Sequence, residues 1–169
     1  MTTTFHKGWY LIYTKPRHEK KVHSRLNELQ INSLLPVKKT LRTWHDRNKY
    51  IDQPLFPSYI FIYLNNMQNY YDGIDIDGSL YYVKTGKQMA QVSEMVVNNI
   101  KLITDQVDEL EVSDDRFQPG RKLVIAKGAL TGLSCEVVEF NNKQKLLVRV
   151  DLLKRNILIA LPEDHFIAL

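Results

Sequence analysis

Basic side chains that could bind phosphate groups are concentrated in the first part of the chain. Residues 1–49 contain 11 Lys and Arg against 3 Asp and Glu, a net charge of +8, and four of the five histidines. The whole chain of 169 residues has a net charge of only +4. A concentrated basic segment is typical of a protein that binds a polyanion, most often nucleic acid. A solvated lysine-rich face would give the same composition, so both interpretations stay open on charge alone.

A helix is predicted to position part of this charge. The pattern of residues 16–31 favours a helix, with Pro16 in the first turn. Apolar residues recur at the spacing i, i+4, i+7 and form one stripe: Val22, Leu26 and Leu29. Basic residues fall on one flank of this stripe or just before the helix: Lys15, Lys21 and Arg25. We expect the helix to pack by its stripe and to offer this flank to phosphates.

A hairpin is predicted next, with residues 41–45 and 49–52 as its arms and the polar segment DRNK (46–49) as its turn. Its tip would present basic side chains beside an aromatic ring: Arg42, Trp44, His45, Arg47 and Lys49. Such a tip could stack on the bases of a single-stranded nucleic acid. The alternative is a charged hairpin whose Trp44 folds onto the core.

Two predicted strands are apolar on both sides. WYLIYT (9–14) is one, and PLFPSYIFIYL (54–64), which becomes a strand at Ser58, is the other. In the second, an aliphatic row alternates with a row of Tyr and Phe. We expect the aliphatic row to face the core. The aromatic row needs a cover, either a helix of the same domain or another protein, and the residues alone favour core packing.

The acidic segment 105–116 is predicted to link two domains. Residues 105–115 contain six acidic residues and no basic one. Beyond it, short strands and turns recur every 8–12 residues over 117–169, which favours a small antiparallel barrel. The predicted organisation is therefore a first domain over 1–104, a linker over 105–116 and a second domain over 117–169.

Several classes of protein are disfavoured by what the sequence does not contain. We find no P-loop, no cluster of zinc ligands and no nucleophile beside an evident base, so we predict no enzyme, no cofactor and no metal site. No apolar run is long enough to cross a membrane, and the first residues have no signal-peptide core. The single cysteine, Cys135, fits a reducing compartment. We expect a cytoplasmic monomer without membrane contact.

The segments WYLIYTKP (9–16), PLFPSYIFIYL (54–64) and YYVKTG (81–86) resemble the N-terminal domain of the NusG family of bacterial transcription elongation factors. FQPGRKLVIAKGALTGLSCEVVEF (117–140) resembles the KOW domain that follows it in that family. The resemblance implies an α+β chain, with an N-terminal α/β sandwich, in which helices flank an antiparallel sheet, followed by a five-stranded KOW β-barrel. Within the family the chain is similar to specialised paralogues, the RfaH-like and UpxY-like antiterminators. Ser58 stands where the housekeeping factors usually have Gly.

The resemblance also implies partners and site residues. The first domain would bind the clamp helices of the largest RNA polymerase subunit, which changes the interpretation of the aromatic row. The matching residues are Leu11, Tyr13, Phe56, Pro57, Tyr59 and Phe61. A basic face on the opposite side would bind the single-stranded non-template DNA of the elongation complex. The matching residues are Lys15, Lys21, Arg25, His45 and Arg47. Near Asp77, RfaH carries an Arg, so the DNA sequence preference need not be the same.

The expected function is therefore transcription elongation and antitermination, with suppression of pausing and termination on a specific set of operons, such as surface polysaccharide genes. The alternative is a KOW-type RNA-binding module that acts on ribosomal RNA without polymerase. The sequence leaves open the target operon, contact with the second polymerase jaw, and whether the KOW domain contacts the ribosome or Rho. It also leaves open whether this domain is autoinhibitory or switches fold.

Overall fold

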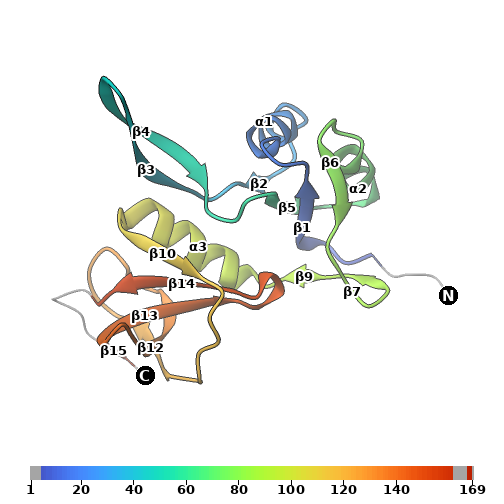
Figure 1. Cartoon of the computed structure of the whole chain (residues 1–169). Coiled ribbons are helices and arrows are strands. Elements are labelled where there is room, and N and C mark those ends of the chain that lie inside the picture. The colour runs from blue at the N-terminus through green and yellow to red at the C-terminus, as the bar shows by residue number, and fades with distance from the viewer. Residues whose placement is uncertain (1–4, 162–166, 169) are drawn as a thin grey trace. The chain divides into compact units, whose positions relative to one another are not determined.

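The computed structural model describes residues 5–161 and 167–168 and divides the chain into two compact units (Figure 1). Unit 1 is Met1–Val97 and unit 2 is Asn98–Leu169. Each unit contains an antiparallel sheet and few helices, which is the mixed α/β composition that the sequence predicts. No helix within the described ranges is both long and apolar enough to span a membrane.

The sheet of unit 1 is built around its first strand. The strand order is β2 (Ser33–Leu34), β5 (Tyr59–Leu64), β1 (Gly8–Thr14) and β6 (Ser79–Tyr82), and β9 (Gln91–Val92) also pairs with β1. All these pairs are antiparallel. The register places Leu11 opposite Phe61 and Tyr13 opposite Tyr59. Because β1 has neighbours along both edges and is buried on both faces, its lack of polar alternation is explained.

Two helices, α1 (Glu19–Glu28) and α2 (Met67–Ile74), cover one face of this sheet. The cluster beneath them combines sheet residues with residues of both helices: Tyr10, Ile12, Ile60, Ile62 and Leu64 with Val22 and Leu26 of α1 and the partly buried Tyr70 and Ile74 of α2. The prediction that the aliphatic row of β5 faces the core is confirmed.

Helix α1 is shorter at both ends than the sequence suggests. It begins at Glu19 rather than Pro16, because Arg17 adopts a left-handed conformation with φ of 65° that a helix cannot include. It ends at Glu28, so Leu29 follows the helix and is 38% exposed. The apolar stripe therefore consists of Val22 and Leu26, both of which are fully buried.

The predicted hairpin exists and is longer than expected. Strand β3 (Val37–Trp44) pairs with β4 (Arg47–Pro54) over eight residue pairs, and the turn is His45–Asp46 rather than residues 46–49. The two strands form a separate two-stranded sheet that projects from the sheet of unit 1 (Figure 1). A second, smaller hairpin consists of β7 (Lys84–Thr85) and β8 (Gln88–Met89).

Helix α3 (Glu94–Gln106) begins directly after Ser93. The Ser93 hydroxyl accepts a hydrogen bond of 3.3 Å from the Val96 amide, as an N-cap residue does. Val97 is the first buried residue of its apolar stripe, whereas Met95 is 58% exposed. The boundary between the units falls inside this helix, after Val97, and not after residue 104.

Unit 2 is a six-stranded sheet in the order β10 (Leu110–Ser113), β14 (Arg155–Ala160), β13 (Lys143–Val150), β12 (Ser134–Phe140), β11 (Arg121–Ile125) and β15 (Ile167–Ala168). A short 3₁₀ turn, Asp151–Leu153, joins β13 to β14. The predicted linker 105–116 differs from this structure, because it contains strand β10, which pairs with β14. Of the six acidic residues, only Glu111 lies in this strand, between Leu110 and Val112, so the charge of the segment could not reveal the strand.

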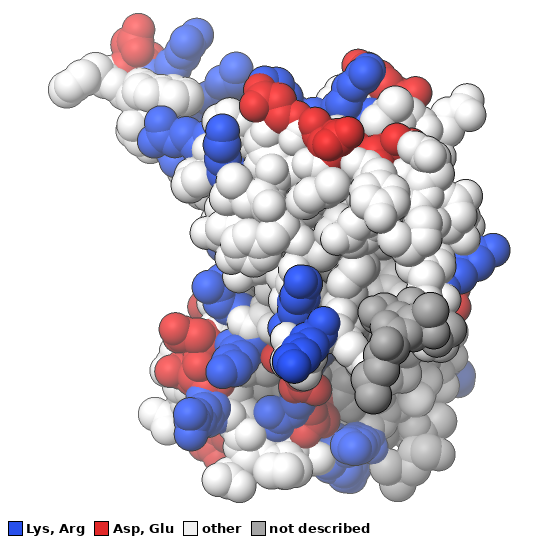
Figure 2. Space-filling model, turned by 90° about the vertical axis from the view of Figure 1, so that its right-hand side faces the viewer, with Lys and Arg blue, Asp and Glu red and all other residues white. Residues whose placement is uncertain are grey.

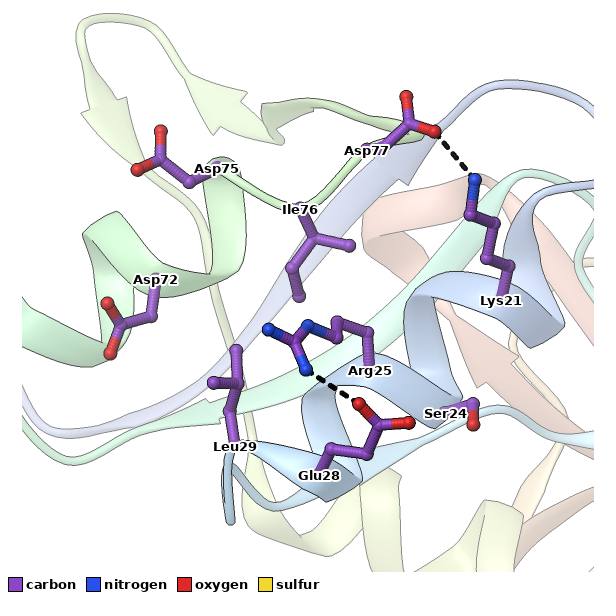
Figure 3. Close-up of a pocket in the computed structure, with 9 residues that line it drawn as sticks. All are labelled: Lys21, Ser24, Arg25, Glu28, Leu29, Asp72, Asp75, Ile76 and Asp77. Carbon is purple, nitrogen blue, oxygen red and sulfur yellow. Dashed lines mark hydrogen bonds and ion pairs between the residues drawn. The ribbon is translucent and has the colours of Figure 1, made fainter.

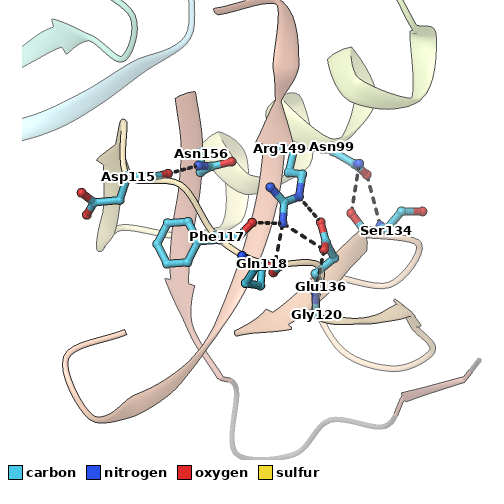
Figure 4. A network of polar contacts seen from close by, with 9 residues as sticks. All are labelled: Asn99, Asp115, Phe117, Gln118, Gly120, Ser134, Glu136, Arg149 and Asn156. Carbon is cyan, nitrogen blue, oxygen red and sulfur yellow. Dashed lines mark hydrogen bonds and ion pairs between the residues drawn. The ribbon is translucent and has the colours of Figure 1, made fainter. Parts of the chain in front are cut away.

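Side-chain hydrogen bonds fasten the segment before β11 to the sheet of unit 2 (Figure 4). Arg149 donates to the Glu136 carboxylate at 2.6 Å and to the Phe117 carbonyl at 3.0 Å. The Gly120 amide donates to the same carboxylate at 3.0 Å. Burial opposes the charge on Glu136, but the hydrogen bonds from Arg149 and Gly120 outweigh it and lower the pKa of this carboxyl. Asn99 of α3 makes a two-point contact with the backbone of Ser134, at 3.1 and 3.2 Å.

Candidate functional site

The aromatic row lies on the face of the unit 1 sheet opposite α1 and α2. Tyr13 and Tyr59 face each other across β1 and β5, with ring centroids 5.2 Å apart at 62°. Phe56 and Phe61 lie 6.2 Å apart at 67°. Edge-on contacts of this kind are favourable for aromatic rings. The structure thus brings the four sequence-predicted aromatic residues together at one face of the sheet.

The exposure of these residues is uneven. Leu11, Phe56 and Phe61 are at most 1% exposed, whereas Tyr13 and Tyr59 are partly buried and Pro57 is exposed. The aromatic row also includes one further residue, on β6, that sequence reasoning missed.

That residue is Tyr81 of β6, which is 53% exposed and stacks on Tyr13 at 4.9 Å. The signal was present in the sequence, because Tyr81 alternates with the buried Tyr82 along β6. The accessible part of the row is therefore a cluster of tyrosines, which we call the tyrosine cluster: Tyr13, Tyr59 and Tyr81.

A strained turn positions Pro57 and Tyr59. Ser58 adopts a left-handed conformation with φ of 70°, which favours glycine and costs an ordinary residue about 1–2 kcal/mol. Its amide donates a hydrogen bond of 2.9 Å to the Glu19 carboxylate, and both residues are buried. The Ser58 carbonyl accepts from the Thr14 amide at 2.8 Å. Helix α1 and strand β1 together therefore hold the turn between Phe56 and Tyr59.

The basic flank of α1 borders a surface cavity of about 590 Å³ (Figure 3). Its lining combines basic, acidic and apolar side chains: Lys21, Ser24, Arg25, Glu28, Leu29, Asp72, Asp75, Ile76 and Asp77. Both predicted DNA-binding cations of the flank have acidic partners here. Lys21 contacts Asp77 and Arg25 contacts Glu28, each at 2.6 Å. The hydrogen bond and the charge of Lys21 lower the pKa of Asp77.

The predicted nucleic-acid residues do not form one continuous patch. Lys15 does not line the cavity, but its backbone is close to it, since the Lys15 amide donates a hydrogen bond of 2.8 Å to the carbonyl of Gly78, next to Asp77. His45 and Arg47 lie instead at the tip of the β3–β4 hairpin. At about 3.3 Å per residue, an eight-residue strand places the tip roughly 25 Å from the base of the hairpin. The sequence could not reveal this separation, because the length of the hairpin was underestimated.

In the view of Figure 2, acidic and basic side chains alternate along the upper edge, and the area directly beneath this edge is largely uncharged. This alternation agrees with the ion pairs at the cavity, and sequence reasoning missed it because Asp77 is 56 positions from Lys21. Among the residues that the structure describes, no group of three or more His, Cys, Asp or Glu side chains is arranged to hold a metal ion.

Comparison with known proteins defines the class of this protein. The family described as "Transcription termination factor nusG" matches residues 7–101, which is more than half of the chain. A solved structure titled "Domain interaction in Thermotoga maritima NusG" has a TM-score of 0.51 and 16% identity, and the match covers 92% of this chain and 94% of that one. An MjSpt4:Spt5 complex gives a TM-score of 0.33 and 13% identity, with 94% and 95% covered.

The chain belongs to the NusG family. The Thermotoga maritima structure adds support for the fold alone, since its identity to this chain is low. Proteins of this family are transcription factors that work with RNA polymerase, and they are not known as enzymes. Membership therefore supports a general role in transcription elongation.

Proposed function

We propose that this chain is a transcription elongation and antitermination factor that binds RNA polymerase at the clamp helices of its largest subunit. Bound there, it suppresses pausing and termination at a specific set of operons, as expected of a specialised paralogue similar to the RfaH-like and UpxY-like proteins. The observation that carries the proposal is the tyrosine cluster, an accessible aromatic surface in a chain of the NusG family.

The tyrosine cluster suits a protein partner. Tyrosine is enriched at protein interfaces, because its ring supplies apolar area while its hydroxyl remains hydrogen-bonded at the rim. Tyr13 lies between Tyr59 and Tyr81, so the rings already support each other before a partner arrives. Pre-ordered side chains lose less conformational entropy on binding. Pro57, which is exposed beside this cluster, extends the same contact surface.

The second contact that we propose is with the non-template DNA strand, at the cavity beside α1 and at the hairpin tip. The residues involved are Lys15, Lys21, Arg25, His45 and Arg47. At the cavity, Lys21 and Arg25 offer donors to phosphates, while Asp77 and its acidic neighbours offer acceptors. Carboxylates accept hydrogen bonds from the amino group of a base such as cytosine. A DNA preference that depends on Asp77 is therefore part of this proposal.

For the second unit we propose the KOW role that the resemblance implies. The antiparallel strands β11 to β14 supply four of the five strands of the proposed barrel over residues 117–169. The network around Glu136 fixes the segment that leads into β11, which supports a stable β-structure there.

A polymerase pull-down tests the proposal. Immobilised bacterial core RNA polymerase is incubated with the wild-type chain, with Tyr59→Ala/Tyr81→Ala, and with the control Tyr71→Ala. Tyr71 is similarly exposed, at 56%, but lies on α2. We expect the wild type and the control to bind and the double variant to lose at least tenfold in affinity. Absence of wild-type binding, or equal binding by all three, refutes the proposed contact.

A transcription assay tests the consequence of binding. Single-round elongation on a template with a strong pause is run with and without the protein. The proposal predicts shorter pauses and more readthrough with the wild type than with the Tyr59→Ala/Tyr81→Ala variant. If the wild-type protein leaves pausing unchanged on every template tested, including templates with the leader sequences of surface polysaccharide operons, the proposed antitermination role is wrong.

A further inference from the structure

The β3–β4 hairpin is attached to the rest of unit 1 at few points. None of the residues 37–54 is buried, and all of residues 41–50 are exposed. The first buried residues on either side are Pro36 and Leu55, and the Leu55 amide donates a hydrogen bond of 2.7 Å to the Pro36 carbonyl. Packing therefore anchors the hairpin only at its base, and from there it projects away from the sheet (Figure 1).

One hydrogen bond joins the hairpin to helix α1 beyond this base. The ammonium group of Lys20 donates a hydrogen bond of 2.8 Å to the carbonyl of Asp52, on β4, and we call this bond the Lys20 contact. Across the described part of the chain, no other hydrogen bond and no ion pair joins residues 37–54 to residues outside them. Because the acceptor is a backbone oxygen, the Lys20 contact holds the strand itself and not a flexible side chain.

The first two residues of α1 hold both ends of the connection between the hairpin and β5. Glu19 accepts a hydrogen bond of 2.9 Å from the amide of Ser58, and Lys20, the next residue, donates to the carbonyl of Asp52. Both contacts are to backbone groups. A cation in the first turn of a helix lies at the positive end of the helix dipole, which is unfavourable. The Lys20 contact offsets this effect, because it gives the ammonium group an oxygen acceptor.

The position of the Lys20 contact along the hairpin determines how strongly it restricts the tip. Asp52 is three residues from Leu55, and Arg47, at the tip, is eight residues from it. At about 3.3 Å per residue, the contact lies roughly 10 Å from the base and the tip roughly 25 Å from it. If the hairpin turns about its base, a displacement at Asp52 becomes about two to three times larger at the tip. One contact at this distance therefore controls the direction of the whole hairpin.

We propose that Lys20 is a positioning residue that fixes the direction of the β3–β4 hairpin relative to α1. The residues of the proposed DNA contact on α1 and at the tip then keep a constant separation: Lys21, Arg25, His45 and Arg47. Two sites at a fixed separation bind one chain with less loss of conformational freedom than two sites that move independently. This consequence for DNA rests on the proposed function, whereas the direction of the hairpin is a property of the free protein.

Distances between two spin labels in the full-length protein test the inference, with neither DNA nor polymerase present. The labels are attached to Asp46→Cys in the hairpin turn and to Gln68→Cys on α2, and Cys135→Ser removes the natural thiol. Both labelled positions are exposed, and α2 packs on the sheet of unit 1. Double electron–electron resonance then gives the distribution of distances between the hairpin turn and the body of the unit.

Three variants separate the hydrogen bond from the charge. Lys20→Met removes the donor and the charge and keeps a side chain of similar length. Lys20→Arg keeps both the donor and the charge. The control Lys39→Met removes the same charge from the residue directly opposite Asp52, which makes no hydrogen bond to α1.

We expect one narrow distribution in the wild type, in Lys20→Arg and in Lys39→Met, and a distribution at least twice as wide in Lys20→Met. The midpoint of thermal unfolding should change by less than about 2 °C in every variant, because the replaced side chains are exposed. A role in stability alone would lower this midpoint without widening the distribution. In fluorescence anisotropy with a labelled single-stranded DNA of 20 nucleotides, Lys20→Met should bind at least threefold more weakly than Lys39→Met, and Lys20→Arg should bind as the wild type does.

Equal widths in the wild type and in Lys20→Met would overturn the inference, and so would equal widening by Lys20→Met and Lys39→Met. A wide distribution in Lys20→Met together with the DNA affinity of Lys39→Met would keep the positioning role and overturn its consequence for DNA binding. If the wild type binds no single-stranded DNA, the proposed DNA contact fails. The distance distributions still decide the role of Lys20 in that case, because they are measured without DNA.

Discussion

Replacing Glu19 tests how the turn before β5 is held. Glu19 and Ser58 are 6% and 8% exposed, and the carboxylate of Glu19 accepts a hydrogen bond of 2.9 Å from the amide of Ser58. Glu19→Ala leaves that amide buried without its acceptor, which costs about 1–3 kcal/mol, and bonds to a charged acceptor lie at the upper end. We expect the free energy of unfolding of unit 1 to fall by about 2–3 kcal/mol. Glu19→Gln retains an acceptor oxygen and should cost about 1 kcal/mol.

Tryptophan fluorescence during urea unfolding measures this effect in unit 1 alone. The two tryptophans of the chain, Trp9 and Trp44, both lie in that unit. Trp9 is 4% exposed and contacts Tyr63 at 5.3 Å, so it reports on the sheet. A Trp44→Phe background removes the signal of the exposed hairpin. With an m value of about 2 kcal/mol/M, the Glu19→Ala midpoint should fall by about 1 M.

The variant Ser58→Gly, at the other residue of this contact, should increase the free energy of unfolding of unit 1 and not lower it. Glycine tolerates a φ of 70°, so strain of about 1–2 kcal/mol is relieved, while the greater freedom of glycine in the unfolded chain offsets part of the gain. We expect unit 1 to gain about 0.5–1 kcal/mol. If Glu19→Ala and Glu19→Gln lower the midpoint equally, the amide acceptor is not what holds the turn and the reasoning is wrong.

Three further predictions concern single side chains. Arg149→Met should lower the free energy of unfolding of unit 2 by about 2–3 kcal/mol, because it leaves the buried Glu136 carboxylate without its cation. Hydrogen exchange at the Gly120 amide, which donates to the same carboxylate, should become faster. If Arg149→Met costs the same in a Glu136→Gln background, the two residues are not coupled and this prediction is wrong. Burial lowers the pKa of His23, so the folded state binds fewer protons than the unfolded state near pH 6. The stability of unit 1 should therefore fall as the pH drops below about 6.5, and His23→Gln should flatten the urea midpoint measured from pH 7.5 to 5.5. Burial raises the pKa of Cys135 to about 11, so a disulfide reagent at pH 8 should label it slowly in the native chain and rapidly in urea, whereas fast native labelling would show an accessible thiol.

The strands of unit 1 could be predicted because their residue pattern carries the information locally. In β5, aliphatic and aromatic residues alternate, and the structure places Ile60 and Ile62 in the core beneath α1. The start of α1 could not be predicted in the same way. Pro16 fits a first turn, but Arg17 is left-handed, and nothing in its residue type indicates a φ of 65°. Strand β10 was missed because its partner, β14, lies more than 40 residues further along the chain.

In the candidate site too, features set by local sequence patterns could be predicted, and contacts between distant residues could not. The part of the aromatic row on β1 and β5 follows from alternation along these strands, whereas Tyr81 on β6 was missed. The acidic partner of Lys21 could not be predicted from the sequence, because Asp77 contacts Lys21 through the tertiary fold and not through helical spacing. Charge counting treats a paired lysine and an unpaired one as equal. The pairing of the α1 cations with carboxylates is therefore visible only in the structure.

Strand β1 explains why one small sheet can serve two surfaces. Its even-numbered residues, such as Ile12, lie beneath α1, whose outer flank carries the cavity cations, while its odd-numbered residues, such as Tyr13, belong to the aromatic row. A register slip of one residue between β1 and β5 would exchange these two faces. The turn at Ser58 lies directly before β5, and its carbonyl is bonded to the end of β1. The contact between Glu19 and Ser58 therefore helps to hold the start of β5 in the register on which both surfaces depend, so weakening it should impair both the proposed polymerase contact and the proposed DNA contact before the unit unfolds.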